Sequence, residues 1–463
     1  MTPDISRRAI SLAMFAGVSG ALLSRADPSQ AAGILAGTLV RTPAELEKAI
    51  AKARPGDTIV MANGSWKDTQ IVFAGQGLPG TPITLAAQTA GQVLMNGKSN
   101  LRIIGEHLVV SGLVFRDGYS PDSEVISFAG GKKSAPSNHC RVTECTIINF
   151  NEPDKKSDGG WVNLHGRHNR VDHCHFEGKT NKGVTVAVRF ELPNSDENHH
   201  SIDHNFFGPR APFNANGAES IRIGTGAFST QTSATLVENN LFEGCSGELE
   251  IISLKTWGNI IRGNIFLRSA GTVTFRQGRF NLVEGNLFVG SSEADAGGVR
   301  IINTDQTVRN NVFVSLRGTD MHSGLSFMNG VPNRTVASYG PVMRGLVENN
   351  TFYDVSAFTF GLHADGERSQ APRDSLFRNN LLINCAPSAF IVKSSVEGIT
   401  FSGNLSNGPA LPEKNFGLTV KAMEAPTQFD AWGMPMLKPE FGVGSSMTKA
   451  PFERKDVGPS YGH

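Results

Sequence analysis

A short phrase, apolar-x-x-Asn-x-Phe, recurs along the chain and restricts its fold more than any other feature. The clearest copies, VENNLF, IRGNIF, VEGNLF, VRNNVF and VENNTF, begin at Val237, Ile261, Val283, Val308 and Val347. The asparagines of the first four copies are 24, 22 and 25 residues apart: Asn240, Asn264, Asn286 and Asn311. A period of about 20 to 50 residues is typical of solenoids, in which each repeat packs only against its neighbours.

The composition of the repeats indicates which kind of solenoid forms. The segments are rich in β-branched residues, are interrupted by Gly and Asn, and show almost no helical periodicity. We therefore predict an all-β fold, a single-domain right-handed parallel β-helix in which the Asn positions stack at turns and the Phe and Val positions fill the interior. The longer gap between Asn311 and Asn350 predicts a loop inserted between two coils.

Residues 1–32 have the pattern of an export signal of the twin-arginine type. Arg7 and Arg8 precede an apolar stretch and then small residues that end near Ala32. An ordinary secretory signal that begins with two arginines is the alternative. Either reading predicts a periplasmic or secreted protein, and the apolar stretch is too short for a membrane anchor.

The rest of the chain is expected to form one domain with a cap at each end. Thr42, Pro43 and Glu45 have the spacing of a capping box, which predicts a short amphipathic helix over the first coil. The β-helix is expected to span residues 33–407. Residues 408–463 lose the repeat and gain Pro and Met, so we expect them to form an irregular C-terminal cap of the same domain.

The charge balance restricts the partners. The net charge is +1, and it becomes 0 without the signal, which holds three Arg and two Asp. Neither nucleic-acid binding nor attraction to a membrane surface is therefore expected, and an acidic ligand requires local positive charge. The sequence leaves the oligomeric state open, and a monomer is compatible with it.

The five cysteines do not have the spacing of a zinc site. Cys145 and Cys174 occupy positions that Asn holds in other copies, so they are expected in neighbouring coils, where a disulfide is one alternative. The preferred interpretation is that all five are small buried residues: Cys140, Cys145, Cys174, Cys245 and Cys385.

Strand alternation predicts which charged residues face outward. Ile221 and Ile223, and equivalent apolar pairs in later coils such as Leu249 and Ile251, are expected to point inward. This leaves five charged residues on the outer face: Arg222, Glu248, Glu250, Arg276 and Arg300. From Arg222 to Glu250, then to Arg276 and Arg300, the steps are 28, 26 and 24 residues. Each step is about one coil, so these side chains should line one face at intervals of about 4.8 Å.

This set of residues suggests a specific chemistry. Asn216, Glu248 and Glu250 supply hard oxygen ligands for Ca²⁺. A cation and the arginines could neutralise a uronate carboxylate and so acidify the neighbouring C5 proton. Lys255 would then act as general base and Arg276 would stabilise the developing charge, which is β-elimination. Hydrolysis, by contrast, needs paired carboxylic acids on either side of the bond.

Several segments resemble polysaccharide lyase family 6, which includes alginate lyases and chondroitinase B. They are NGAESIRIG, ELEIISLK, GTVTFRQG, GGVRIIN and MNGVPN, which begin at Asn216, Glu248, Gly271, Gly297 and Met328. The resemblance implies a right-handed parallel β-helix that cleaves by Ca²⁺-assisted β-elimination. It implies Lys255 as base and Arg276 as acid, calcium ligands at Asn216, Glu248 and Glu250, and substrate contacts at Arg300 and Arg222.

The resemblance also leaves particular residues in question. Gln277 stands where many members have His, and it can hydrogen-bond a sugar but cannot titrate. His165 lies in a segment similar to one in the family, and Tyr339 could stack on a sugar, so both join Gln277 as candidate substrate contacts. Lys255 lies an odd five residues from Glu250, so a bend after Ile252 is expected to return it to the cluster.

The predicted partner is an anionic polysaccharide, and alginate is the first choice. Dermatan or chondroitin sulfate is an alternative substrate within the same family. A catalytically inactive carbohydrate-binding β-helix and a β-helical glycosidase or esterase are alternatives of other classes. The charged residues could also form only a solvated ion-pair ladder, without any catalytic role.

Overall fold

The structure is a computed structural model that describes residues 36–131, 135–192, 195–332, 335–408, 416–436 and 442–461. Ala36–His463 form one compact unit. The expected export signal lies outside the described residues. Within them, no helix combines the length and apolar character that a membrane span requires.

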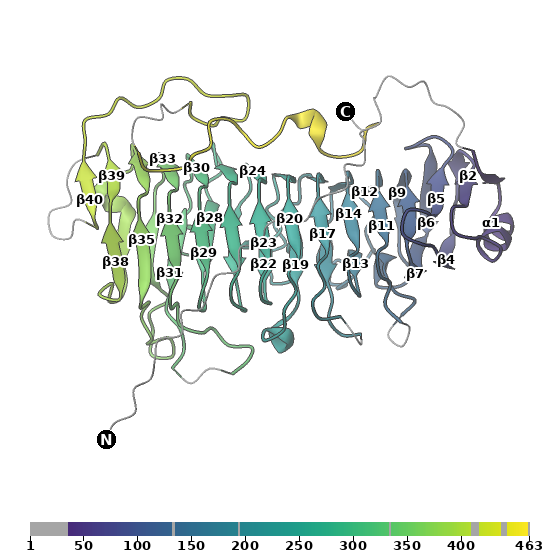
Figure 1. Cartoon of the computed structure of the whole chain (residues 1–463), viewed down its shortest axis with the longest axis horizontal. Helices are drawn as coiled ribbons and strands as arrows, with labels where there is room; N and C mark the ends of the chain where they lie inside the picture. The colour runs from purple at the N-terminus through teal and green to yellow at the C-terminus, as the bar shows by residue number, and fades with distance from the viewer. Residues whose placement is uncertain are drawn as a thin grey trace. The chain divides into compact units, whose positions relative to one another are not determined.

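The unit is a parallel β-helix, as predicted (Figure 1). Each coil adds one strand to sheet A, then one to sheet B and one to sheet C, and neighbouring strands within each sheet run parallel. Sheet A consists of β1 (Thr38–Val40), β2 (Thr58–Met61), β5 (Ile83–Ala87), β8 (Leu108–Ser111), β11 (Arg141–Thr143), β14 (Arg170–Asp172), β17 (Ser201–Asp203), β20 (Leu236–Glu238), β23 (Ile260–Arg262), β26 (Leu282–Glu284), β29 (Thr307–Arg309), β32 (Leu346–Glu348), β35 (Ser375–Arg378) and β38 (Ile399–Ser402).

The other two sheets continue the same stack. Sheet B consists of β3 (Gly64–Ser65), β6 (Val93–Lys98), β9 (Leu113–Tyr119), β12 (Thr146–Ile148), β15 (His175–Glu177), β18 (Phe206–Phe207), β21 (Leu241–Glu243), β24 (Ile265–Leu267), β27 (Leu287–Val289), β30 (Val312–Val314), β33 (Thr351–Tyr353), β36 (Leu381–Ile383), β39 (Asn404–Ser406) and β40 (Leu418–Val420). Sheet C consists of β4 (Gln70–Gln76), β7 (Asn100–Glu106), β10 (Glu124–Ser127), β13 (Gly160–Leu164), β16 (Val186–Val188), β19 (Ile221–Ile223), β22 (Glu250–Leu254), β25 (Gly271–Phe275), β28 (Ala296–Ile301), β31 (Leu325–Met328), β34 (Phe358–Leu362) and β37 (Phe390–Val392).

The helices are short. The α-helix α1 (Pro43–Ile50) packs beside β1, β2 and β4 at the first coil, where it buries Leu46. Its N-cap is the predicted Thr42, whose hydroxyl accepts a hydrogen bond from the Glu45 amide. Short 3₁₀ turns are η1 (Gly226–Phe228), η2 (Asp320–His322), η3 (Pro387–Ala389) and η5 (Arg454–Asp456).

The repeated phrase forms two buried columns. The backbone N–H of each ladder asparagine donates to Oδ1 of the next one, at 3.0 Å from Asn240 to Asn264 and 2.9 Å from Asn264 to Asn286. The phenylalanine two residues on stacks with its counterpart, with ring centroids 4.8 Å apart for Phe242 and Phe266. The ladder satisfies polar groups at a buried turn, and the ring column fills the interior.

The cysteines take part in this packing as small buried residues. All five thiols are free and buried, so the alternative of a Cys145–Cys174 disulfide is not realised. The Cys174 amide donates to Oδ1 of Asn205 at 3.0 Å, which places Cys174 in the asparagine column as expected. Burial raises the pKa of Cys140 to about 12, so this thiol remains protonated and unreactive.

The C-terminal segment contributes more than an end cap. Residues 416–436 and 442–461 add β40 to sheet B and then run back across the outside of that sheet (Figure 1). Met434 and Val457 pack on apolar outer residues of sheet B, among them Leu287 and Val312. We call the residues 428–436 and 442–461 the strap, because they cover this apolar face over many coils.

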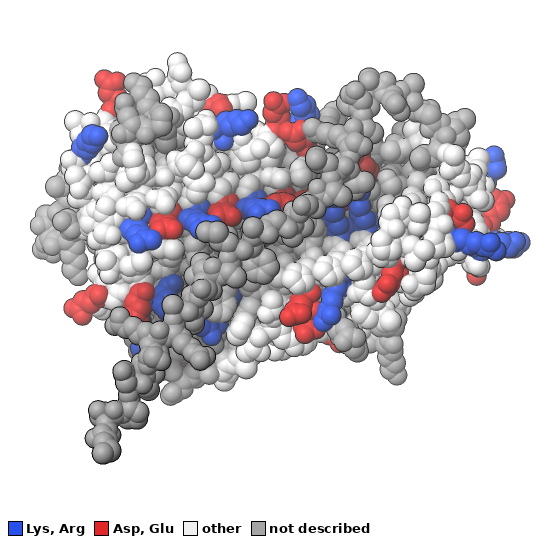
Figure 2. Space-filling view, in the orientation of Figure 1, with Lys and Arg blue, Asp and Glu red and all other residues white. Residues whose placement is uncertain are grey.

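The outer face of sheet A is charged instead. One row, in register, reads Glu238, Arg262, Glu284, Arg309, Glu348 and Arg378. Figure 2 shows such a row of alternating acidic and basic side chains. Ion pairs join its members, for example Arg309 to Glu284 at 2.8 Å and Arg378 to Glu348 at 2.8 Å.

Candidate active site

Four neighbouring strands of sheet C, together with the residues directly after their ends, carry five of the selected residues: Arg222, Glu250, Lys255, Arg276 and Arg300. Arg222 of β19 pairs in register with Ser253 of β22, which pairs with Thr274 of β25 and then Arg300 of β28. The alternating residues, such as Ile221 and Val273, lie in the core. Ser253 and Thr274 therefore occupy the row between the two arginines, whereas Glu250 lies at the start of β22 and Arg276 directly follows β25. The predicted residues come from adjacent coils, but Glu250 and Arg276 are out of register with Arg222 and Arg300.

A bulge in β22 determines how its side chains point. The register between β22 and β25 shifts between Glu250 and Ile252, so Ile251 is an extra residue. Ile251, Ile252 and Leu254 are all in the core, whereas Glu250 and Lys255 lie on the outer side. The expected bend after Ile252 is therefore wrong, because the irregularity precedes that residue.

Leu249 was also predicted to point inward, and this is wrong. Leu249 is half-buried and lines a pocket together with Glu248 and Glu250. Strand β22 begins only at Glu250, so the alternation rule does not apply to the residues before it.

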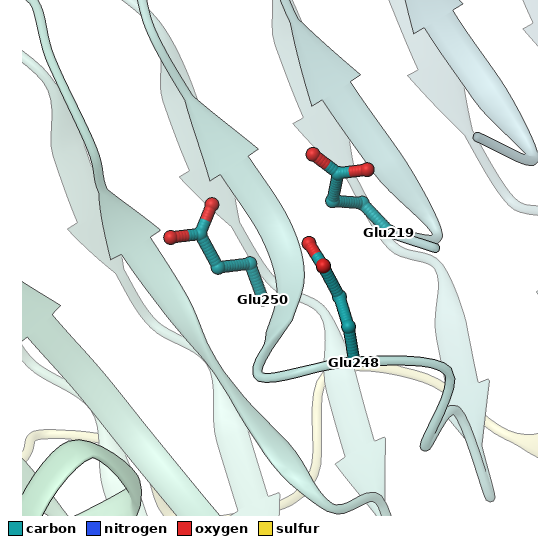
Figure 3. A group of neighbouring side chains, drawn as sticks. All are labelled: Glu219, Glu248 and Glu250. Atoms are coloured by element: carbon teal, nitrogen blue, oxygen red, sulfur yellow. The ribbon is translucent and has the colours of Figure 1, made fainter. Parts of the chain in front are cut away.

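Three carboxylates converge on the outer side of β19 and β22, as Figure 3 shows for Glu219, Glu248 and Glu250. One oxygen from each lies within 4.8 Å of the others. We call these residues the acid cluster. The sequence analysis missed Glu219, because alternation from Ile221 would have placed it in the interior. The structure begins β19 at Ile221, so Glu219 precedes the strand and its side chain turns toward the cluster.

The acid cluster has fewer hydrogen-bond donors than its buried charge requires. Glu219 is fully buried, and neither of its carboxylate oxygens has a hydrogen-bond partner among the described residues. Glu248 accepts from the Gly217 N–H at 2.9 Å through one oxygen, while its other oxygen is buried without a partner. Burial and the neighbouring Glu219 and Glu250 raise the pKa of Glu248 to about 7.

Glu250 is compensated by cations instead. Burial alone would raise its pKa, but Arg300, Arg276 and Lys255 hold the pKa of Glu250 below its ordinary value. Arg276 approaches its carboxylate at 3.1 Å, and Arg300 and Ser253 also donate to it. Glu250 therefore connects the acid cluster to the arginines.

The orphaned oxygens of Glu219 and Glu248 fit a hard divalent cation. Carboxylate oxygens are the ligands that Ca²⁺ prefers, and a cation would offset the repulsion of three neighbouring acids. Asn216 lines the same pocket as Glu248 and Glu250. This pocket has a volume of about 620 Å³, and Asp295, His322 and Arg276 also contribute to its wall.

Lys255 lies next to Glu219, whereas Arg276 lies next to Glu250. The Lys255 Nζ is 3.6 Å from Oε1 of Glu219, and the lysine side chain is 14% exposed. Arg222 approaches the second oxygen of Glu219 at 3.7 Å. A partly exposed amine beside a buried carboxylate is thus held at the edge of the site, where it can still meet a ligand.

The structural and sequence comparisons agree on one family. The Chondroitinase B family model matches residues 40–436. The PL6 family alginate lyase AlyGC has a TM-score of 0.88 and 44% identity, over 92% of this chain and 59% of that one. The chain belongs to polysaccharide lyase family 6. It spans about three-fifths of the length of AlyGC.

Two further members of family 6 cover more of their own length. A mannuronic acid specific lyase from human gut microbiota has a TM-score of 0.77 and 30% identity, over 84% of this chain and 91% of that one. The polysaccharide lyase Pedsa3628 from Pseudopedobacter saltans has a TM-score of 0.74 and 26% identity, over 92% of this chain and 100% of that one. No curated protein matches the chain.

In this family 6 chain, the other predicted substrate contacts differ in their surroundings. Arg300 is only 2% exposed and is ion-paired with Glu250. Tyr339 lies against Arg276, whose guanidinium carbon is 4.4 Å from the ring centroid. Gln277 is 5% exposed and donates to the Ala337 carbonyl at 2.9 Å. Their roles toward substrate stay predictions.

His165 lies apart from the acid cluster. It lines a second pocket in sheet C, of about 1090 Å³, together with Arg102, Asn163 and Arg189. Burial lowers the pKa of His165 to about 4, so its ring is neutral near pH 7.

Two residues in the wall of the acid-cluster pocket, Asp295 and His322, were not selected from the sequence. Neither belongs to a copy of the repeat or to a segment that resembles the family.

Proposed function

We propose that the chain is an exported alginate lyase that cleaves its substrate by β-elimination, with Ca²⁺ in the acid cluster. The observation that carries this proposal is the placement of Lys255 and Arg276 on either side of the acid cluster, in which both oxygens of Glu219 and one oxygen of Glu248 are buried without donors among the described residues. AlyGC, described as an alginate lyase, shares 44% identity with this chain.

The acid cluster and Asn216 would hold the calcium ion. Bound there, Ca²⁺ would neutralise a uronate carboxylate and so lower the pKa of its C5 proton. Arg222 and Arg300 lie beside Glu219 and Glu250, so they supply positive charge on the same face of sheet C. The same arrangement suits an anionic sugar and disfavours a neutral one.

Lys255 is the group that would accept the proton. In its neutral form, its amine takes the C5 proton, and the electron pair of that bond forms the C4–C5 double bond as the C4–O bond breaks. Arg276 faces the same site and would donate to the leaving oxygen and stabilise its charge. The products are one saturated end and one unsaturated uronate.

An ultraviolet assay on mature protein tests this reaction class. Alginate should give rising absorbance from the conjugated product, and a chelator should suppress the rise, with added Ca²⁺ restoring it. Reducing ends without new absorbance would indicate hydrolysis, and binding without either product would indicate an inactive carbohydrate-binding protein. Both outcomes would contradict the proposal.

Dermatan sulfate is the second candidate substrate, since the matching family model is that of Chondroitinase B. A panel of mannuronate blocks, guluronate blocks, mixed alginate and dermatan sulfate separates the two. Alginate activity without activity on dermatan sulfate is the expected result.

The export signal in residues 1–32 is tested separately. The full-length chain is located in a bacterial host, and its location is compared with that of a variant in which Arg7 and Arg8 are replaced.

A further inference from the structure

An inserted segment reaches back over the catalytic strands. Residues 335–340, which we call the bridging loop, belong to the insertion between β31 and β32. The Ser229 hydroxyl, next to η1, donates to the Val336 carbonyl at 2.6 Å. The Gly340 N–H donates to Oδ1 of Asn303, just after β28, at 2.8 Å. The bridging loop therefore contacts turns that follow β19 and β28.

Gln277 forms a hydrogen bond with the middle of the bridging loop. Its side-chain amide donates to the Ala337 carbonyl at 2.9 Å, and its backbone N–H donates to the Leu254 carbonyl at 3.0 Å. The residue is 5% exposed, so its side chain is enclosed between the loop and the sheet. Gln277 therefore connects the loop to the backbone that immediately precedes Lys255.

The same loop supplies the aromatic face against Arg276. The Arg276 guanidinium lies 4.4 Å from the centre of the Tyr339 ring, and its Nη1 is 3.1 Å from Glu250. Asn303 also donates to the Arg276 carbonyl at 3.1 Å. A guanidinium held between a carboxylate and an aromatic face has little freedom to rotate.

We propose that Gln277 is a positioning residue, which acts on Arg276 through the bridging loop and Tyr339. Gln277 has no charge to titrate, and its side-chain amide donates to the Ala337 carbonyl, so its contribution is to keep the loop docked. Loss of this contact would let the Tyr339 ring leave the guanidinium, and a small displacement of Arg276 would slow the reaction. This inference rests on the role of Arg276 in the proposed function.

Gln277→Leu tests the inference, because leucine has a similar size and no donor. Ser338→Ala is the matched control, since the Ser338 hydroxyl donates within the loop, to the Thr335 carbonyl at 2.9 Å, and to no other described residue. Hydrogen exchange of the bridging loop and steady-state kinetics on alginate are measured for both. Gln277→Leu should speed loop exchange about fivefold, as expected for one lost hydrogen bond, and lower kcat at least about threefold with little change in KM.

Three outcomes would contradict the positioning role of Gln277. Unchanged exchange in Gln277→Leu would show that Gln277 does not hold the loop, and faster exchange with unchanged kcat would show that the loop does not position Arg276. A raised KM at constant kcat would mean that Gln277 binds substrate directly. Combining Gln277→Leu with Tyr339→Leu should add little to either single effect. Were the natural protein inactive on uronates, the proposed function would fail, while exchange would still test the loop contact.

Discussion

At the scale of single residues, Lys255 depends on its neighbours for its place in the site. Its amine is 3.6 Å from Glu219, a carboxylate with no hydrogen-bond partner among the described residues. Burying such an ion pair costs free energy, because both charges lose water, unless further charges nearby offset this loss. The arginines beside Glu219 and Glu250, and a cation in the acid cluster, would supply those charges.

Replacing Lys255 by alanine should lower kcat by at least about a hundredfold, because general-base groups contribute roughly this much or more. The matched control is Lys67→Ala, which removes an exposed lysine from a turn in the first coil. Initial rates of unsaturated product formation provide the measurement, with circular dichroism to check folding. Full activity in Lys255→Ala would refute the assignment of this base.

Glu219→Gln should weaken cation binding while leaving the fold intact. The substitution keeps the size of the side chain and removes one of three clustered charges. A ligand that binds only the folded state raises Tm by mass action, so the Ca²⁺-induced rise in Tm should shrink. Glu238→Gln, on sheet A, is the control and should retain the full rise. An identical rise in both variants would exclude Glu219 from the cation site.

At the scale of elements, columns of like residues hold successive coils in register. The histidines of one turn stack at 4.9, 4.8 and 5.3 Å between ring centroids, in the order His107, His139, His168 and His199. Burial, the neighbouring histidines and Arg167 lower the pKa of His168. Burial and His139 lower the pKa of His107, against the opposing effect of Glu106.

This histidine column predicts a loss of stability in acid. The folded pKa lies below the unfolded one, so the contribution is present above about pH 6.5 and is lost as pH falls through the lowered values. His168→Asn should make the urea midpoint less dependent on pH between about 7 and 5. Asparagine suits the position because His168 has a φ of 57°. An unchanged pH dependence would contradict the prediction.

At the scale of the whole molecule, the strap keeps an apolar outer face of sheet B from solvent. Met434 is 1% exposed and packs on that face, whereas Met436, two residues on, is 55% exposed. The strap therefore extends the hydrophobic core beyond the interior of the coils. It explains why Met434 and Val457 are buried although they lie in a segment without the repeat.

Met434→Ser should lower the free energy of unfolding by about 2 to 4 kcal/mol, since it removes a buried apolar side chain and leaves a hydroxyl in its place. Met436→Ser, the control in the same segment, should change it by less than about 0.5 kcal/mol. Chemical denaturation measures both. Equal effects would show that the strap does not contribute to the core.

The repeat allowed much of this molecule to be predicted. A period of about one coil identifies which residues become neighbours, because a solenoid stacks each repeat on the previous one. Arg222, Glu250, Arg276 and Arg300 were thus assigned to adjacent coils correctly. The buried asparagine and phenylalanine columns follow from the same local pattern.

The sequence by itself determined the β-helix, its helical cap and the set of strands that form the site. Only the tertiary structure decided how side chains meet there. The bulge at Ile251 and the turn of Glu219 toward the cluster break strict alternation, and the bridging loop lies outside the repeat. Local periodicity repeats in every coil, whereas a bulge or an inserted loop takes its position from packing against coils distant in sequence.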